Sequence, residues 1–388
     1  MHVTPYQDDV FLPESYRDIE KQVKANDIII VASTGSKTII GKAGYIDSVL
    51  DNTQIGAFLR IIRPLFAEIV PYIKLVFATK YYMDYISNQS SGTNINNIKT
   101  EHVAKLFIPI PSLSEQERVA FRVKNLFSKL DIIDSNQSDI ETLYDELKKR
   151  TLDLAIQGKL VPQDENDEPA SVLLEKIRAE KKAKLGKKYV DSYIYKGDDN
   201  CYYEKVDSEV RNITEEIPFD IPQTWEWIRL RQVIDFSKSA SISPEQIKPN
   251  DWILDLEDIE KNSSCILQKK RMYQTQAKSD KHAFCKGNVL YSKLRPYLNK
   301  VIVADEDGYC TSEILVFDFS PIYNEYAKIY LMSPFFVDYA MMGAYGVKMP
   351  RMGSDRGNNA LMPLPSLNEQ IRIITQLKSI LDKLKDGI

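Results

Sequence analysis

Apolar residues in the middle of the chain recur in alternating steps of four and three. The series is Val119, Val123, Leu126, Leu130, Ile133, Gln137, Ile140, Tyr144, Leu147, Thr151 and Leu154. Such spacing is typical of a coiled-coil seam, and single polar seam residues, here Gln137 and Thr151, commonly fix the register. Ser112 or Ser114 can cap the start. We therefore expect a helix over about 113–157 that needs a partner helix.

The chain contains a second copy of the stretch that opens this helix. Residues 363–372 read Pro-Leu-Pro-Ser-Leu-Asn-Glu-Gln-Ile-Arg, and residues 109–118 read Pro-Ile-Pro-Ser-Leu-Ser-Glu-Gln-Glu-Arg. The same offset aligns Gly92 with Gly346 and residues 72–75 with residues 326–329. A repeat of this length indicates two copies of one unit, each a globular part followed by a helix. The second helix is the expected partner of the first.

The remaining patterns predict an α+β fold. It consists of two mixed α/β domains in tandem repeat, separated by long helices that form an antiparallel coiled coil. We expect strands at 27–32, 39–46, 288–291, 301–304 and 313–319, and helices at 72–86, 172–184 (capped by Ser171) and 324–342. The domains are expected at 1–112 and 218–366. A helical spacer at 113–188, a linker at 189–217 and a short helix at 367–388 complete the chain.

Composition narrows the class of protein. The 388 residues carry a net charge of −4, and no stretch reaches the roughly 18–20 apolar residues that span a membrane. The N-terminal residues lack a signal pattern, and the four cysteines are scattered without a Cys-x-x-Cys pair. We therefore expect a cytoplasmic protein with reduced thiols, and neither a zinc site nor a disulfide framework.

Charge is concentrated in one window. Residues 261–300 hold eight Lys and two Arg against one Asp, a net charge of +9, interleaved with aromatic residues. Such clusters neutralise phosphates, and an Arg in the major groove can bind guanine. The alternative is a lysine-rich solubilising surface. The corresponding loop of the first copy, 33–37, is polar but far less basic. The amide-rich loop 88–97 is either a solvated loop or a loop that forms hydrogen bonds with a polar partner such as base edges.

From these loops we predict two sets of DNA-contacting residues. The first copy contributes Ser33, Thr34, Ser36, Lys37, Gln89, Thr93 and Asn94. The second copy contributes Lys269, Lys270, Arg271, Lys293, Arg295, Tyr297, Lys300, Lys348 and Arg351. The two copies share a scaffold and differ in these loops, as expected if each reads a different sequence.

Signatures of catalysis are missing from the sequence. There is no Gly-x-Gly-x-x-Gly, no P-loop and no acidic-Pro-Pro-aromatic methyltransferase motif, and the three histidines are isolated. The cluster at 257–261 contains acids and a lysine, but its spacing is common, so an autonomous nuclease is a minor alternative. We read Trp225 and Trp227 as core residues rather than base-stacking groups.

The chain resembles the specificity (S) subunits of type I restriction-modification systems. The most specific match is residues 151–171, Thr-Leu-Asp-Leu-Ala-Ile-Gln-Gly-Lys-Leu-Val-Pro-Gln-Asp-Glu-Asn-Asp-Glu-Pro-Ala-Ser, which is similar to the stretch after the central helix of such subunits. Residues 108–116 and 362–370 resemble the entries to the two helices. Residues 222–230, Pro-Gln-Thr-Trp-Glu-Trp-Ile-Arg-Leu, resemble the opening of a target-recognition domain.

The resemblance implies a non-catalytic subunit that reads a bipartite, asymmetric site on double-stranded DNA. It also implies partners, namely methyltransferase (M) and restriction (R) subunits. No cofactor is expected on this chain, and S-adenosylmethionine, ATP and Mg are expected on the partners.

The sequence departs from the family pattern at two places. The first copy lacks a counterpart to residues 218–254, and the second helix is shorter than the first. A truncated chain, a gene shortened by rearrangement and a subunit completed by another chain are the three explanations. A scaffold or an inactive, shortened subunit is the alternative function.

Overall fold

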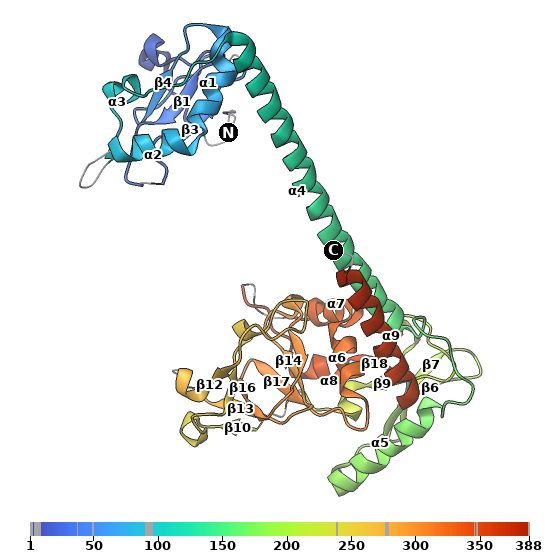
Figure 1. Cartoon of the computed structure of the whole chain (residues 1–388). Coiled ribbons are helices and arrows are strands. Elements are labelled where there is room, and N and C mark those ends of the chain that lie inside the picture. Colours follow the sequence, from blue (N-terminus) through green and yellow to red (C-terminus); the bar gives the residue numbers. More distant parts are fainter. Residues whose placement is uncertain are drawn as a thin grey trace. The chain divides into compact units, whose positions relative to one another are not determined.

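The computed structural model describes residues 3, 9–36, 38–48, 50–89, 96–237, 240–275, 279–344, 346 and 348–386 (Figure 1). The chain divides into two compact units, Met1–Gln137 and Ser138–Ile388, and each is described by itself.

The first unit is built on a small antiparallel sheet in the order β3-β1-β4. Its strands are β1 (Ile28–Val31), β3 (Ala43–Tyr45) and β4 (Leu59–Ile62), and β2 (Ser33–Thr34) pairs with β5 (Asn96–Asn97). Helices α1 (Val70–Phe77), α2 (Lys80–Gln89) and α3 (Thr100–Ala104) follow, and short 3₁₀ turns lie at Glu14–Tyr16, Ile19–Lys21 and Ala67–Ile69. Buried Ile28 and Ile30 of β1 share a core with Tyr82 and Ile86 of α2. The predicted strand at 27–32 is confirmed, whereas residues 38–41, placed in the next strand by sequence, form a turn.

The second unit contains three sheets that correspond to the expected target domain. A three-stranded antiparallel sheet has the order β15-β14-β17, a five-stranded mixed sheet has the order β10-β13-β16-β11-β12, and β18 pairs with β9. Their bounds are β9 (Glu226–Arg229), β10 (Ser241–Ile242), β11 (Trp252–Leu254), β12 (Lys270–Arg271), β13 (Lys281–Phe284), β14 (Val289–Ser292), β15 (Val301–Val303), β16 (Gly308–Thr311), β17 (Ile314–Phe317) and β18 (Leu361–Leu364). Helices α6 (Asn324–Met332), α7 (Pro334–Met342) and α8 (Ser354–Asn359) complete it. The predicted strands β14, β15 and β17 are confirmed.

The helices predicted at 72–86 and 324–342 are each two helices, so those predictions are wrong in the same way. A hydroxyl interrupts each one. Thr79 Oγ1 donates to the Val76 carbonyl over 2.6 Å and accepts from Tyr82 N, and Ser333 Oγ does the same between Tyr330 and Phe336. Because such side chains compete for backbone groups, they end one helix and cap the next.

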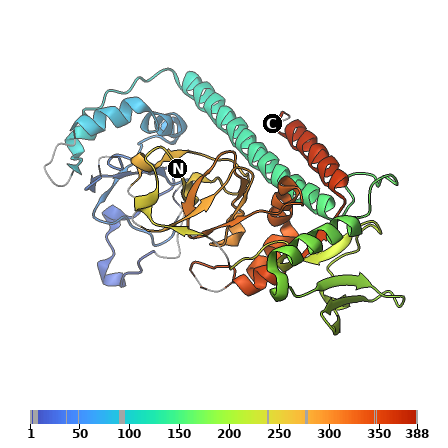
Figure 2. The same cartoon turned by 90° about the horizontal axis from the view of Figure 1, so that it is seen from below.

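Helix α4 (Leu113–Ile156) confirms the long helix expected from the seam. Its C-terminal part packs against α9 (Leu367–Asp386): Leu152, Ala155 and Ile156 share one core with Ile373, Ile374 and Leu377. Figures 1 and 2 show α9 running alongside α4 in the opposite direction, which is the antiparallel helical pair predicted. Seam residues further toward the start of α4 are about half exposed, for example Leu126 (53%), Ile133 (57%) and Ile140 (47%).

The connection after α4 is fixed by a glycine. Gly158 has φ +70°, and a Cβ at this position would lie 2.5 Å from Pro222 Cγ, so only glycine fits the predicted end of the helix. Helix α5 (Ala170–Leu185) then begins one residue before Ser171. Pro169 occupies the capping position without a side-chain bond, so the cap assigned to Ser171 is wrong.

The stretch predicted as a linker is a sheet. Strands β6 (Ser192–Lys196), β7 (Tyr202–Val206) and β8 (Glu209–Asn212) form an antiparallel meander. Its inner face buries Ile194 beside Trp227 and, instead of a second apolar residue, Glu204 paired with Arg229. Because a charged residue occupies an inward-facing position, the sequence lacks the alternation of apolar and polar residues on which a strand prediction depends.

Candidate nucleic-acid interface

Corresponding backbone bonds show that the two units are built alike around the predicted loops. The first loop leaves β1 in one unit and β14 in the other, and it is closed by Val31 N to Lys42 O (3.0 Å) and by Ser292 N to Lys300 O (3.1 Å). The sheets have the same order, with β3-β1-β4 matching β15-β14-β17. The loop from 32 to 42 therefore corresponds to the loop from 293 to 300.

A second loop joins the first in each unit. Ile98 N donates to Ala32 O over 2.7 Å, and Met352 N donates to Lys293 O over 3.1 Å. A bridge beside each bond pairs Ser33 with Asn97 and Leu294 with Arg351. The structure thus brings together, within each unit, the two loops that the sequence nominated separately.

Left-handed backbone shapes the basic loop of the second unit. Arg295 (φ +51°) and Asn299 (φ +50°) both lie in the αL region, where asparagine is favoured and arginine is strained. Asn299 donates through its side chain to Met332 O (2.8 Å), and Arg295 N donates to Pro350 O (2.7 Å). These two bonds anchor the loop at both of its left-handed residues.

The side chains of this loop pair divide into held and exposed groups. Arg351 binds Glu313 through Nη2 (2.8 Å) and Nε, and this guanidinium holds the pKa of the Glu313 carboxyl below its usual value. Lys293 lowers that pKa further through its charge. Lys348 and Tyr297 are exposed, whereas Lys300 donates to Leu256 O (2.6 Å) and burial lowers the pKa of its ammonium.

The other predicted basic cluster is neutralised within the fold. Lys269 pairs with Asp305 (2.7 Å), Lys270 with Asp258 (2.7 Å) and Arg271 with Glu306 (2.5 Å). The pKa of the Lys270 ammonium is raised because Asp258 and Glu257 both accept from it. The acids lie outside the +9 window, so the window's charge overstates the positive charge of this surface. DNA contact by these three residues stays a prediction, and it would require an exchange of partners.

In the first unit the predicted residues are polar, and the hydrogen bonds of Thr34 and Ser36 are to near neighbours in the same loop. Ser36 N donates to Thr34 Oγ1, and Ser36 Oγ lies 2.9 Å from Thr38 Oγ1. Gln89 is exposed at the end of α2. Lys37, Thr93 and Asn94 lie outside the described residues.

Two charged residues that position the loops were missed by the sequence analysis. Arg60 donates to Thr100 Oγ1 (2.6 Å) and to Ile98 O, next to the point where the first unit's loops meet. Glu313 has the same role for Arg351. Each acts on a residue some 40 positions away, and no local spacing signals such a pair.

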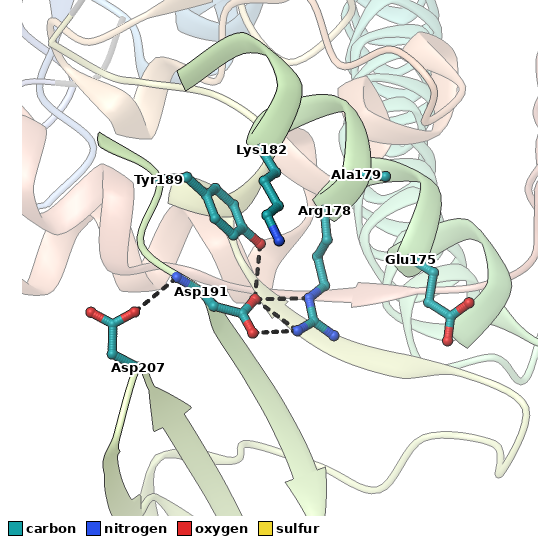
Figure 3. A pocket seen from close by; sticks show the side chains of 7 residues that line it. All are labelled: Glu175, Arg178, Ala179, Lys182, Tyr189, Asp191 and Asp207. Carbon is teal, nitrogen blue, oxygen red and sulfur yellow. Dashed lines mark hydrogen bonds and ion pairs between the residues drawn. The ribbon is translucent and has the colours of Figure 1, made fainter. Parts of the chain in front are cut away.

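A hollow of about 300 Å³ lies between α5 and the meander (Figure 3). Arg178 forms a two-pronged ion pair with Asp191 there, with Nη2 to Oδ2 at 2.5 Å, and Tyr189 donates to the same carboxylate. Arg178 holds the pKa of Asp191 below its usual value. This ion pair joins α5 to the residue before β6, and we interpret it as a structural clamp.

Metal and membrane chemistry find no support in the part of the chain that the structure describes. No group of three or more His, Cys, Asp or Glu residues there is arranged to hold a metal. None of the described helices is both long and apolar enough to cross a bilayer.

Comparisons with known proteins show which class of protein this chain resembles. Residues 14–142 match the type I restriction modification DNA specificity domain. The chain is 30% identical over 171 residues to the type I restriction enzyme EcoKI specificity subunit of Escherichia coli (strain K12), covering 44% of this chain and 37% of that one. It is 24% identical over 297 residues to the EcoDI specificity subunit of Escherichia coli, covering 76% and 59%.

A solved chain shares the fold. It comes from a study of complex assembly and conformational transition of the type I R-M system, and it matches with a TM-score of 0.54 and 18% identity, over 94% of this chain and 76% of that chain. This chain is therefore similar to type I restriction-modification specificity subunits, as the resemblance predicted. Its prediction as a specificity subunit rather than an enzyme agrees with the relatives' names. It spans 37% and 59% of the lengths of the two relatives above.

Proposed function

We propose that the chain is the DNA-recognition subunit of a type I restriction-modification complex and that it reads a bipartite, asymmetric site. The observation that carries the proposal is the repeated loop junction, Ile98 N to Ala32 O and Met352 N to Lys293 O. One scaffold occurs twice with different side chains on the same two loops. Two such surfaces suit two different half-sites.

The chemistry of the loops supports direct reading by each unit. Hydroxyl and amide groups in the first unit can donate to and accept from base edges, and Lys293, Arg295 and Lys348 in the second can contact phosphates or guanine. In this proposal the helices serve as docking elements for M and R subunits. Those partners bind S-adenosylmethionine, ATP and Mg, and the chain acts in the cytoplasm.

The test is co-purification with the modification subunit encoded beside it, followed by mapping of methylated adenines in cellular DNA. A split motif with a fixed gap, lost when this chain is deleted, is the expected result. Methylation that persists without the chain would refute the proposal.

A non-reading scaffold is the second candidate, and the ion pairs of Lys269, Lys270 and Arg271 favour it because they weaken the basic field. It predicts a stable complex with the modification subunit that protects no particular DNA sequence. Footprinting of that complex on cellular DNA fragments separates the two candidates.

A further inference from the structure

A short segment before α4, residues 107–110, has the same backbone setting as β18 of the second unit. In the first unit the Phe107 carbonyl accepts from Tyr81 Oη and the Pro109 carbonyl accepts from Tyr72 Oη, each over 2.8 Å. Both segments lead through a Pro-Ser-Leu stretch into a long helix. The segment therefore presents two alternate carbonyls to tyrosine hydroxyls, as β18 does.

In the second unit the equivalent carbonyls, those of Leu361 and Pro363, accept from Tyr330 (2.8 Å) and Tyr326 (2.9 Å). Alternate residues of an extended chain direct their backbone groups to opposite sides, so the other edge of β18 is left for a neighbour. That neighbour is β9, which pairs antiparallel with Pro363 opposite Trp227.

Within the part of the first unit that the structure describes, the corresponding edge has no neighbouring strand. Among the described residues, the backbone groups of Ile108 and Ile110 form no backbone–backbone hydrogen bond. Phe107 is 86% exposed where Leu361 is 6% exposed, and Ile110 is 71% exposed where Leu364 is fully buried. In the second unit, β9 and the residues packed around it cover the surface that is exposed at the matched positions of the first unit.

A carboxylate beside this edge lacks the partner that its counterpart has. Glu369 is buried and accepts from Trp225 Nε1 over 2.8 Å. Glu115 occupies the same position at the start of α4, is exposed, and accepts no hydrogen bond from the described residues. An open strand edge, two exposed apolar side chains and an acceptor for an indole N–H thus lie together.

We propose that residues 107–110 accept an extended segment from another polypeptide as an antiparallel strand. The segment has the pattern Trp-x-Trp-Ile of residues 225–228 and pairs in the register in which residues 226–229 face residues 361–364, and its first indole donates to Glu115. Main-chain bonds supply affinity and the two indoles supply selectivity, as in other strand-addition complexes. The chain's own β9 is already paired with β18 and is not free to fill this edge, and the occupant that we propose is a segment of a separate polypeptide.

The experiment uses the full chain and a fluorescent peptide with the sequence of residues 218–231, followed by fluorescence anisotropy. Saturable binding of one peptide per chain is expected. Ile110→Asp and Glu115→Leu, both at exposed positions, should each weaken it at least tenfold, as should Ala in place of the first Trp of the peptide. Val210→Asp, at an exposed apolar residue of β8, is the matched control and should bind as the unchanged chain does.

Hydrogen exchange locates the peptide. Protection is expected at 107–110 with β18 unchanged. Absence of saturable binding, equal binding by the Ile110→Asp chain, or protection at β18 through displacement of β9 would each overturn the proposal. The function proposed above is tested separately by methylation mapping, so either can fail alone.

Discussion

Trp225 and Glu369, 144 residues apart, are joined by a 2.8 Å hydrogen bond from the indole N–H to a buried carboxylate. The bond ties the opening of the second target domain to the first turn of α9. Glu369 also accepts from Gln163, which follows α4, so one carboxylate connects three segments of the second unit. Burial raises the pKa of this carboxyl above its usual value.

Trp225→Phe should destabilise the second unit by about 1–3 kcal/mol, because it leaves a buried acceptor without its donor. Trp227→Phe is the control, since Trp227 Nε1 is buried without a partner in the described structure and its loss removes no hydrogen bond. Urea unfolding of both variants measures the difference. Equal losses would show that the bond contributes nothing beyond ring packing.

Glu204→Gln should be among the most damaging single substitutions, at about 3–5 kcal/mol. Glu204 is 2% exposed and receives Arg229 (3.1 Å), Arg231 (2.5 Å) and Arg211 (3.1 Å). Burial alone would raise the pKa of this carboxyl, but the guanidinium groups outweigh it and the pKa is lowered. Glu209→Gln, exposed on β8, is the matched control in a thermal melt. A drop in Tm no larger than that of the control would contradict the prediction.

Asp167→Asn should cost about 1–2 kcal/mol at neutral pH and less in acid. Arg372 donates to Asp167 over 2.6 Å and lowers the pKa of its carboxyl, so the unfolded chain takes up the proton first as pH falls. The pair therefore stabilises fully above the unfolded value of about 3.8, and its contribution disappears as pH falls through the lower folded pKa. Unfolding measured from pH 7 to 3 should show the two stability curves converging. A gap that stays constant with pH would exclude this cause.

Gly41→Ala should weaken the first unit selectively. Gly41 has φ +79°, and an added Cβ would lie 2.7 Å from Ile86 Cγ2. Left-handed strain alone costs about 1–2 kcal/mol. Hydrogen exchange followed by mass spectrometry should show lost protection in β1 and α2, with β14 and α6 unchanged. Gly35→Ala is the control, because open space surrounds that position and its φ is not in the left-handed range. Equal loss of protection in both units would contradict the selectivity.

Lys293→Glu and Lys348→Glu should abolish specific DNA binding by the complex with the modification subunit, at one half-site only. If each lysine contacts a phosphate, Lys→Gln at either position should reduce the salt slope of log K by about 1. Lys184→Glu, exposed on α5, controls for net charge. Binding titrations against DNA with either half-site scrambled provide the measurement. Unchanged discrimination at both half-sites would remove this loop from the recognition surface.

Sequence pattern predicted those features that depend on neighbours along the chain. The four-and-three spacing located α4 to within a residue, and the repeat predicted that residues 72–75 and 326–329 play the same part. It failed where a distant partner decides the structure. From sequence alone Glu204 is expected to face solvent, because its partner Arg229 is 25 residues away. Residues 189–217 were therefore predicted as a linker.

The candidate site was predictable in its loops and not in its charges. The repeat nominated the loops after β1 and β14, and the structure joins each to a second nominated loop. Whether a lysine is available depends on acids that folding brings near it. Asp305 and Glu306 follow β15, so only the fold places them against Lys269 and Arg271.

The junction between the two loops is made by main-chain atoms: Ile98 N to Ala32 O in one unit, Met352 N to Lys293 O in the other. Such bonds do not depend on which side chains the loops carry. A mutation that replaces an exposed loop side chain therefore alters what the unit touches while leaving its frame in place. Under the function proposed above, new DNA preferences can then arise by single exchanges, without an unstable intermediate between the old target and the new one.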